Sequence, residues 1–208
     1  CHGYIDKLAD LDKSIRICLD SKLQYPAACN AMETLLVHKD IAGKVLPDLV
    51  GIFKVKHVEL VGCVNACQVV AAVTPAHESD WDMEYNDLKL SIKIVDSFSE
   101  AVKFINRHGS GHTDVIITEN LERAEQFLNE VSSSSVMWNA STRFADGFRY
   151  GLGAEIGIST NRTHARGPVG LEGLIIYKYK LYGNGQVAGD YSGANAREFT
   201  HKPLTPSM

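Results

Sequence analysis

The sequence lacks the features that would place the protein in a membrane, on a nucleic acid or outside the cell. No apolar run approaches the ~20 residues that a membrane-spanning helix requires, and the apolar stretches are short, such as residues 115–117. Lys and Arg form no basic cluster and the net charge is −4, which argues against nucleic acid as a partner. There is no secretory signal and the five cysteines show no disulfide-type spacing, so we expect a reducing, cytoplasmic environment.

Two common site motifs are also missing. No Gly-x-Gly-x-x-Gly motif follows a predicted strand, because the glycine pairs at 109/111 and 151/153 lack the rest of the pattern. Cys63 and Cys67 have a spacing compatible with one side of a zinc centre, but no second Cys or His pair stands at a matching interval. We predict no metal site and expect these two cysteines to pack in the core from one helix face.

What is present is the alternation of helical and strand patterns that is typical of a layered α/β protein. Helices are expected over residues 10–24, 45–53, 63–73, 97–108 and 120–128, the second of them entered near Pro47, and strands over 34–38, 58–61, 88–95, 115–118 and 136–139. Ser97 and Glu100 form a capping box and Asn120 caps the last helix. Strands separated by single helices pair in parallel, so we predict an open, mainly parallel sheet flanked by helices.

The composition changes after residue 139. Seven glycines lie between positions 147 and 173 among charged residues, which predicts long loops of the kind that often carry function. Residues 175–182 return to a strand pattern, and the Gly-, Ser-, Asn- and Pro-containing residues after them predict a flexible tail. We therefore assign residues 1–173 to a catalytic domain and 174–208 to a late strand and tail.

Cys29 is the candidate nucleophile. It follows Pro26 and two alanines, a context that we interpret as a loop-to-helix junction, where helix N-terminal amides would stabilise a thiolate and supply an oxyanion contact. A small buried core residue is the alternative that position alone favours.

Four segments decide between these readings. They are YPAACNAMETLL at 25–36, WNASTRFADG at 138–147, GLGAEIGIST at 151–160 and HARGPVGL at 164–171. In this order they closely resemble the γ-glutamyl phosphate reductases, also called glutamate-5-semialdehyde dehydrogenases, of the aldehyde dehydrogenase superfamily. The resemblance implies the C-terminal catalytic portion, with a late strand that pairs between subunits of a homo-oligomer and a nucleotide-binding domain that would precede residue 1. Residues 150–160 and 182–188 look closer to fungal members, which favours a separate reductase over a kinase fusion.

The resemblance also implies a reaction. Cys29 would displace phosphate from L-glutamyl 5-phosphate, the product of glutamate 5-kinase, and NADPH would reduce the resulting thioester to L-glutamate 5-semialdehyde in proline biosynthesis. Without the nucleotide-binding domain, the 208-residue chain alone is expected to be inactive. Two alternatives stay open: a catalytically silent oligomerisation or regulatory module of the same fold, and a general semialdehyde dehydrogenase.

Other site residues follow from the resemblance and from their position. Glu84 resembles the superfamily glutamate that holds the nicotinamide ribose, with a solvated loop acid as the alternative, and Asn30 would support the oxyanion beside Cys29. Residues at the end of the strand over 136–139 occupy the place where α/β sheets bind ligands, and arginine forks there would bind the substrate carboxylate or pair with nearby acids. The candidates for substrate binding are Asn139, Ser141, Thr142, Arg143 and Arg166. His164 is a weaker candidate for acid–base chemistry, and a structural role is its alternative.

Overall fold

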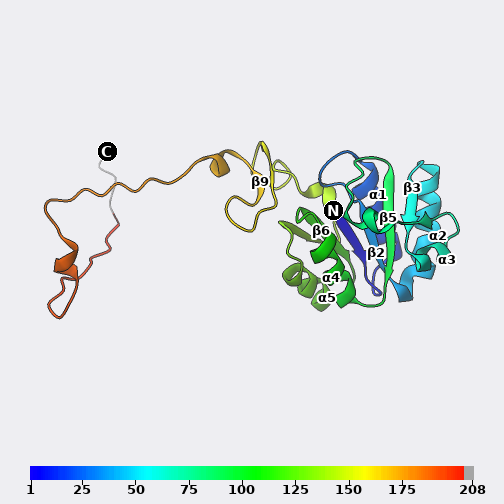
Figure 1. The fold of residues 1–208 in the computed structure, drawn as a ribbon, viewed down its shortest axis with the longest axis horizontal. Coiled ribbons are helices and arrows are strands. Elements are labelled where there is room, and N and C mark those ends of the chain that lie inside the picture. The colour runs from blue at the N-terminus through cyan, green and yellow to red at the C-terminus, as the bar shows by residue number, and fades with distance from the viewer. Residues whose placement is uncertain (204–208) are drawn as a thin grey trace. The chain divides into compact units, whose positions relative to one another are not determined.

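The core of the molecule is one seven-stranded sheet, in which every neighbouring pair of strands is parallel (Figure 1). The computed structural model describes residues 1–203. The strand order is β4-β3-β5-β2-β1-β6-β7, which confirms the predicted open parallel sheet. The strands are β1 His2–Ile5, β2 Thr34–His38, β3 Glu59–Gly62, β4 Thr74–Pro75, β5 Lys89–Val95, β6 Thr113–Ile117 and β7 Ser135–Trp138.

Helices cover both faces of this sheet. They are α1 Leu11–Leu23, α2 Lys39–Val55, α3 Val64–Val69, α4 Phe98–His108 and α5 Leu121–Glu130. Because successive strand residues point to opposite faces, Leu35 and Val37 of β2 join a core cluster with α1, α2 and α3, whereas Leu36 joins a second cluster with α4 and α5. The sheet is therefore buried on both faces, as its apolar strands require.

The predicted caps are present, with one displacement. Ser97 accepts a hydrogen bond from the Glu100 amide at 3.2 Å, and Asn120 accepts one from the Arg123 amide at 2.7 Å. The return contact of the capping box goes to the amide of Asp96, which donates to Glu100 Oε2 at 2.8 Å, rather than to the amide of Ser97. The cap holds the residue before the helix as well as the helix itself.

Two predicted helix boundaries were wrong. The helix expected to be entered near Pro47 begins at Lys39, and Pro47 lies inside α2. Proline costs a helical hydrogen bond, but buried apolar residues on both sides of it, such as Ile41 and Leu49, keep the helix on the sheet. The helix expected over 63–73 ends at Val69, since Val70 is already extended.

The segment after β7 is mostly loop, as its glycines predict. It contains the short 3₁₀ helices η2 Thr142–Phe144 and η3 Leu171–Leu174 and an antiparallel pair, β8 Gly157–Ser159 with β9 Gly167–Val169. Residues 1–175 form one compact unit and residues 176–208 a second. The second unit contains a 3₁₀ helix, η4 Ala188–Tyr191.

The strand predicted over 175–182 is not formed in the described chain, where these residues are extended without sheet partners. A strand needs a neighbouring strand to bond its amides and carbonyls, and its large side chains, among them Tyr177 and Tyr179, are almost fully exposed. Of the predicted flexible tail, residues 204–208 lie outside the described part of the chain.

Candidate active site

Cys29 lies in a turn between α1 and β2, at the edge of the sheet where the strands begin. The turn is held by amide-to-carbonyl hydrogen bonds from Ala28 to Tyr25 at 3.1 Å and from Ala31 to Ala28 at 2.9 Å. No helix starts here, so the predicted loop-to-helix junction was wrong: Met32 bonds back to Ser21 and the chain enters β2. The Cys29 side chain is exposed, which rules out the buried structural cysteine.

The thiol faces a histidine that the sequence reading had missed. Cys29 Sγ lies 3.2 Å from His112 Nε2, and His112 Nδ1 lies 2.7 Å from Thr113 Oγ1. Burial lowers the pKa of His112 to about 4, so the ring is neutral at pH 7. A glycine-rich loop that ends in a histidine immediately before an apolar strand is the signal that could have identified it.

The charges around Cys29 shift the pKa of its thiol in opposite directions. Partial burial raises the pKa of the thiol, the carboxylates of Glu155 and Glu84 raise it further, and the guanidinium of Arg143 lowers it. The resting pair is therefore a thiol beside a neutral imidazole, and attack requires the thiol proton to be removed.

Asn30 points away from the thiol into the protein. Its side chain is buried, and Nδ2 donates to the carbonyl oxygen of Ala145 at 2.9 Å. Among the described residues, Asn30 Oδ1 has no hydrogen-bond partner. In this arrangement Asn30 fixes the Cys29 turn to the segment after η2.

The residues of η2 lie along the end of α1, close to the Cys29 turn. Ser21 Oγ donates to Ser141 Oγ at 3.2 Å and accepts from the Thr142 amide at 3.2 Å. Both Ser141 and Thr142 are buried, so they attach the loop to α1. Arg143, next along the chain, donates from Nε to Gln24 Oε1 at 2.7 Å.

Two arginines share a small hollow beside this turn. Arg149 donates to the carbonyl oxygen of Arg143, and burial together with the neighbouring charge of Arg149 lowers the pKa of Arg143. The hollow has a volume of about 180 Å³. It is lined by Asp20, Gln24, Arg143, Phe144 and Arg149. Two guanidinium groups at one hollow favour an anion there.

The remaining predicted residues are spread over the domain. Asn139 exchanges hydrogen bonds with the backbone of Thr118 at the opposite edge of the sheet, where the strands end. Arg166 donates to the carbonyl oxygen of Ser132, and His164 is exposed. The structure thus brings Arg143 and Glu84 to Cys29 but places Asn139 at the other edge.

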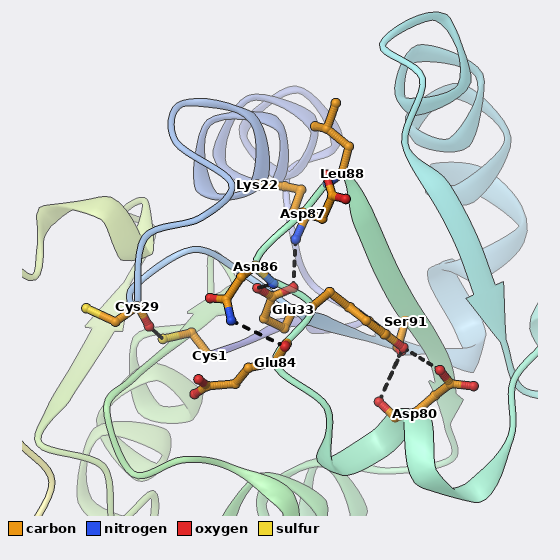
Figure 2. A network of polar contacts seen from close by, with 11 residues as sticks. Cys1, Lys22, Cys29, Glu33, Asp80, Glu84, Asn86, Asp87, Leu88 and Ser91 are labelled. Carbon is orange, nitrogen blue, oxygen red and sulfur yellow. Dashed lines mark hydrogen bonds and ion pairs between the residues drawn. The ribbon is translucent and has the colours of Figure 1, made fainter.

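A buried ion pair connects the Cys29 turn with the loop that carries Glu84 (Figure 2). Lys22 Nζ lies 2.7 Å from Glu33 Oε2, and Glu33 Oε1 accepts from the Asn86 amide at 3.2 Å. Loss of hydration lowers the pKa of Lys22 and raises that of Glu33. Figure 2 shows the Glu84 carboxylate and the Cys29 thiol on the same side of this network.

The hydroxyl of Tyr85 also holds the loop that carries Glu84. The Tyr85 hydroxyl donates to Asp80 Oδ1 at 2.8 Å and accepts from Ser91 Oγ at 2.7 Å. Burial is the main cause that raises the pKa of Tyr85. Tyr85 and Asn86 therefore both anchor this loop, although the Glu84 side chain is exposed.

Comparisons with known proteins show the family of the chain. The chain is 57% identical to the γ-glutamyl phosphate reductase of Acetivibrio thermocellus over 204 residues, which are 98% of this chain and 47% of that protein. It is 56% identical to the one from Methanococcoides burtonii over 213 residues, 100% of this chain and 47% of that protein. The chain belongs to the γ-glutamyl phosphate reductase family. It spans about half the length of these curated relatives, and no protein-family model matches it.

Solved structures share the fold of this chain, including those of aldehyde dehydrogenases. The γ-glutamyl phosphate reductase of Thermotoga maritima matches with a TM-score of 0.86 and 45% identity over 90% of this chain and 45% of that chain. The Saccharomyces cerevisiae reductase gives 0.56 and 33% over 92% of this chain and 43% of that chain. Lactaldehyde dehydrogenase from Escherichia coli shares the fold, with a TM-score of 0.55 and 17% identity over 68% and 39% of the two chains.

The structure also bears on metals and membranes. Among residues 1–203 no group of three or more His, Cys, Asp or Glu side chains could hold a metal ion. In the same part of the chain, no helix has the length and apolar character needed to cross a bilayer.

Proposed function

We propose that the protein reduces L-glutamyl 5-phosphate to L-glutamate 5-semialdehyde with NADPH and releases phosphate, through a thioester on Cys29. The observation that carries the proposal is the accessible Cys29 thiol, 3.2 Å from a neutral imidazole, in a chain of the γ-glutamyl phosphate reductase family. An acyl phosphate reacts readily with a thiolate, and the thioester accepts a hydride, whereas a free carboxylate does not. Cys29 thereby divides one difficult reduction into two feasible steps.

The residues near Cys29 suit the substrate and part of the cofactor. Arg143 and Arg149 would bind a carboxylate or phosphate of the substrate in their shared hollow. The exposed carboxylate of Glu84 pairs with no other described residue, so it is available to accept hydrogen bonds from the ribose hydroxyls of NADPH. When bound, NADPH would supply the hydride that reduces the thioester.

The other predicted residues receive supporting roles in this proposal. Asn30, Ser141 and Thr142 would hold the catalytic turn and the arginine loop against α1 through the contacts already described. Asn139 and Arg166 are engaged with backbone groups elsewhere and would contact substrate only if these bonds changed. We assign the carboxylate contact to Arg143 and Arg149 because they share a hollow beside the Cys29 turn.

The proposal extends to the setting of the reaction. The protein would act in the cytoplasm, downstream of glutamate 5-kinase, as a homo-oligomer in which the exposed stretch 175–182 pairs with another copy. Because the relatives are about twice as long as this chain, we expect the 208 residues on their own not to reduce glutamyl phosphate with NADPH.

A phosphate requirement tests the reaction in reverse. With NADP⁺ and glutamate semialdehyde, the intact protein should form NADPH when inorganic phosphate is present, because phosphate releases the acyl group from Cys29. Succinic semialdehyde under the same conditions is the control substrate. Oxidation without phosphate would instead identify a general semialdehyde dehydrogenase, and no oxidation in either case would favour a catalytically silent module.

The thiols themselves offer a second test, without substrate. Iodoacetamide at neutral pH should modify Cys29 faster than Cys63, and Cys63 faster than Cys18, as followed by peptide mass spectrometry. Cys29 is exposed beside a proton acceptor, whereas Cys18 is fully buried and its pKa is raised by that burial. Equal rates at Cys29 and Cys63 would show that the site does not activate its thiol.

A further inference from the structure

We propose that His112 accepts the proton of the Cys29 thiol and delivers it to the departing phosphate. This assignment rests on the proposed function and adds a catalytic residue to it. The geometry points to this role because His112 Nε2 lies 3.2 Å from Cys29 Sγ, within reach for a hydrogen bond that involves sulfur.

A contact at Nδ1 orients the imidazole ring of His112. A neutral imidazole that accepts a proton at Nε2 carries its own proton on Nδ1, and that nitrogen lies 2.7 Å from Thr113 Oγ1. The hydroxyl of Thr113 is fully buried, so it offers Nδ1–H an acceptor away from solvent. This contact accommodates the tautomer in which Nε2 is free to take the thiol proton.

The backbone of His112 is fixed as well. Its carbonyl oxygen accepts hydrogen bonds from Ser134 Oγ at 2.7 Å and from the Ser135 amide at 2.9 Å. Its amide lies 3.3 Å from Ser110 Oγ. The imidazole therefore projects from the start of β6 toward Cys29 with little freedom, which general acid–base catalysis requires.

Burial keeps His112 neutral at rest. It is the main cause of the low pKa of the ring, whereas the carboxylate of Asp114 raises that pKa. Asp114 is itself buried and accepts hydrogen bonds from the His2 amide and from Ser133 Oγ. The ring is therefore unprotonated next to the thiol, and because its pKa is low it would hold the transferred proton only until the departing phosphate takes it.

The proton transfer balances over the reaction. The S–H bond of Cys29 breaks and the proton moves to His112 Nε2; sulfur then bonds to the acyl carbon as the carbon–oxygen bond to phosphate breaks. The phosphate takes the proton from the imidazolium and leaves as hydrogen phosphate. After hydride reduction, the aldehyde departs, and the thiolate regains a proton from water, which is the one proton that the overall reduction consumes.

His112 variants in the intact protein test the assignment. His112→Ala should lower kcat/KM for glutamyl phosphate roughly 10²-fold to 10⁴-fold at pH 7, with KM little changed, and the loss should shrink at high pH, where the thiol ionises without help. Imidazole added to the buffer should restore part of the rate. His112→Gln, which keeps a polar side chain, should show the same loss if the alanine variant does not fold. The matched control is His38→Asn at the opposite edge of the sheet, where the residue caps α2.

Alkylation of Cys29 tests the role of His112 independently of the proposed substrate. Iodoacetamide should modify Cys29 more slowly in both His112 variants than in the wild type at pH 7, and equally fast at high pH. If this holds while glutamyl phosphate is not reduced, the role of His112 stands and the proposed function fails. Two results would overturn the assignment. One is a folded His112→Ala or His112→Gln variant with the alkylation rate and kcat/KM of the wild type. The other is a loss of kcat/KM that neither high pH nor added imidazole restores.

Discussion

Replacing Cys29 with serine should reduce NADPH-dependent turnover of glutamyl phosphate by at least about 10⁴-fold. The serine hydroxyl keeps the geometry of the turn but ionises far less readily than a thiol, and the oxygen ester that it would form is a poorer hydride acceptor than a thioester. Steady-state kinetics of the intact protein measure the effect. Circular dichroism and thermal unfolding should match the wild type, since the side chain is exposed.

The control for this substitution is Cys63→Ser. Cys63 precedes α3 as its N-cap, and its sulfur accepts from the Ile94 amide at 3.3 Å, a contact that a serine hydroxyl can make. This variant should retain activity. Substantial turnover by Cys29→Ser, or equal losses in both variants, would contradict the assignment of Cys29 as nucleophile.

The Lys22→Met substitution should destabilise the fold by about 3–5 kcal/mol, because it leaves the Glu33 carboxylate buried without its counter-charge. The ion pair measures 2.7 Å and Lys22 is fully buried. Urea unfolding measures the loss. The double variant Lys22→Met/Glu33→Gln should recover most of it, because the glutamine is neutral and its carbonyl can still accept from the Asn86 amide.

An exposed ion pair provides the comparison. Lys13 and Glu119 also lie 2.8 Å apart, but both side chains are about half exposed, so solvent screens the pair and Lys13→Met should leave stability little changed. Equal effects at Lys22 and Lys13, or no recovery in the double variant, would show that burial of the charge does not govern the stability of this network. Lys22→Met should also loosen the loop that carries Glu84, because Glu33 holds Asn86.

The sheet and its caps were predictable because they depend on local rules. The apolar run in β2, the apolar alternation in β5 and the caps Ser97 and Asn120 are set by neighbouring residues. The start of α2 was predicted wrongly because the burial of its apolar residues outweighs the helical hydrogen bond that is lost at Pro47. The stretch over 175–182 has no sheet partner within the described part of one chain, since its pattern is local but the partner expected for it belongs to another subunit.

Candidate site residues that lie in a sequence motif could be named from the sequence. Residues that only the folding of the chain brings together could not. Cys29 stands in a long family segment, and Glu84 and Arg143 were named from theirs. His112 lies 83 positions from Cys29 in the sequence, and only the parallel arrangement of β2, β1 and β6 brings the two together. The general rule that ligands bind where parallel strands end directed attention to Asn139, whereas the thiol lies where the strands begin.

That edge of the sheet explains how the parts of the site relate. The Cys29 turn precedes β2, His112 precedes β6 and the loop that carries Glu84 precedes β5, so all three lie at the same edge. The loop after β7 returns along α1 to bring Arg143 there through its bond with Gln24. The proposed nucleophile, proton acceptor, cofactor-binding carboxylate and cation thus come from four separate stretches of chain.

The covalent intermediate is the most direct test of the central claim. The intact protein is mixed with glutamyl phosphate, generated in the same tube by glutamate kinase and ATP, in the absence of NADPH, and then quenched in acid. Peptide mass spectrometry should find a glutamyl group on Cys29, removed by hydroxylamine and absent from Cys29→Ser. A fully active, phosphate-releasing protein that carries no acyl group on Cys29, or carries it on another residue, would contradict the mechanism.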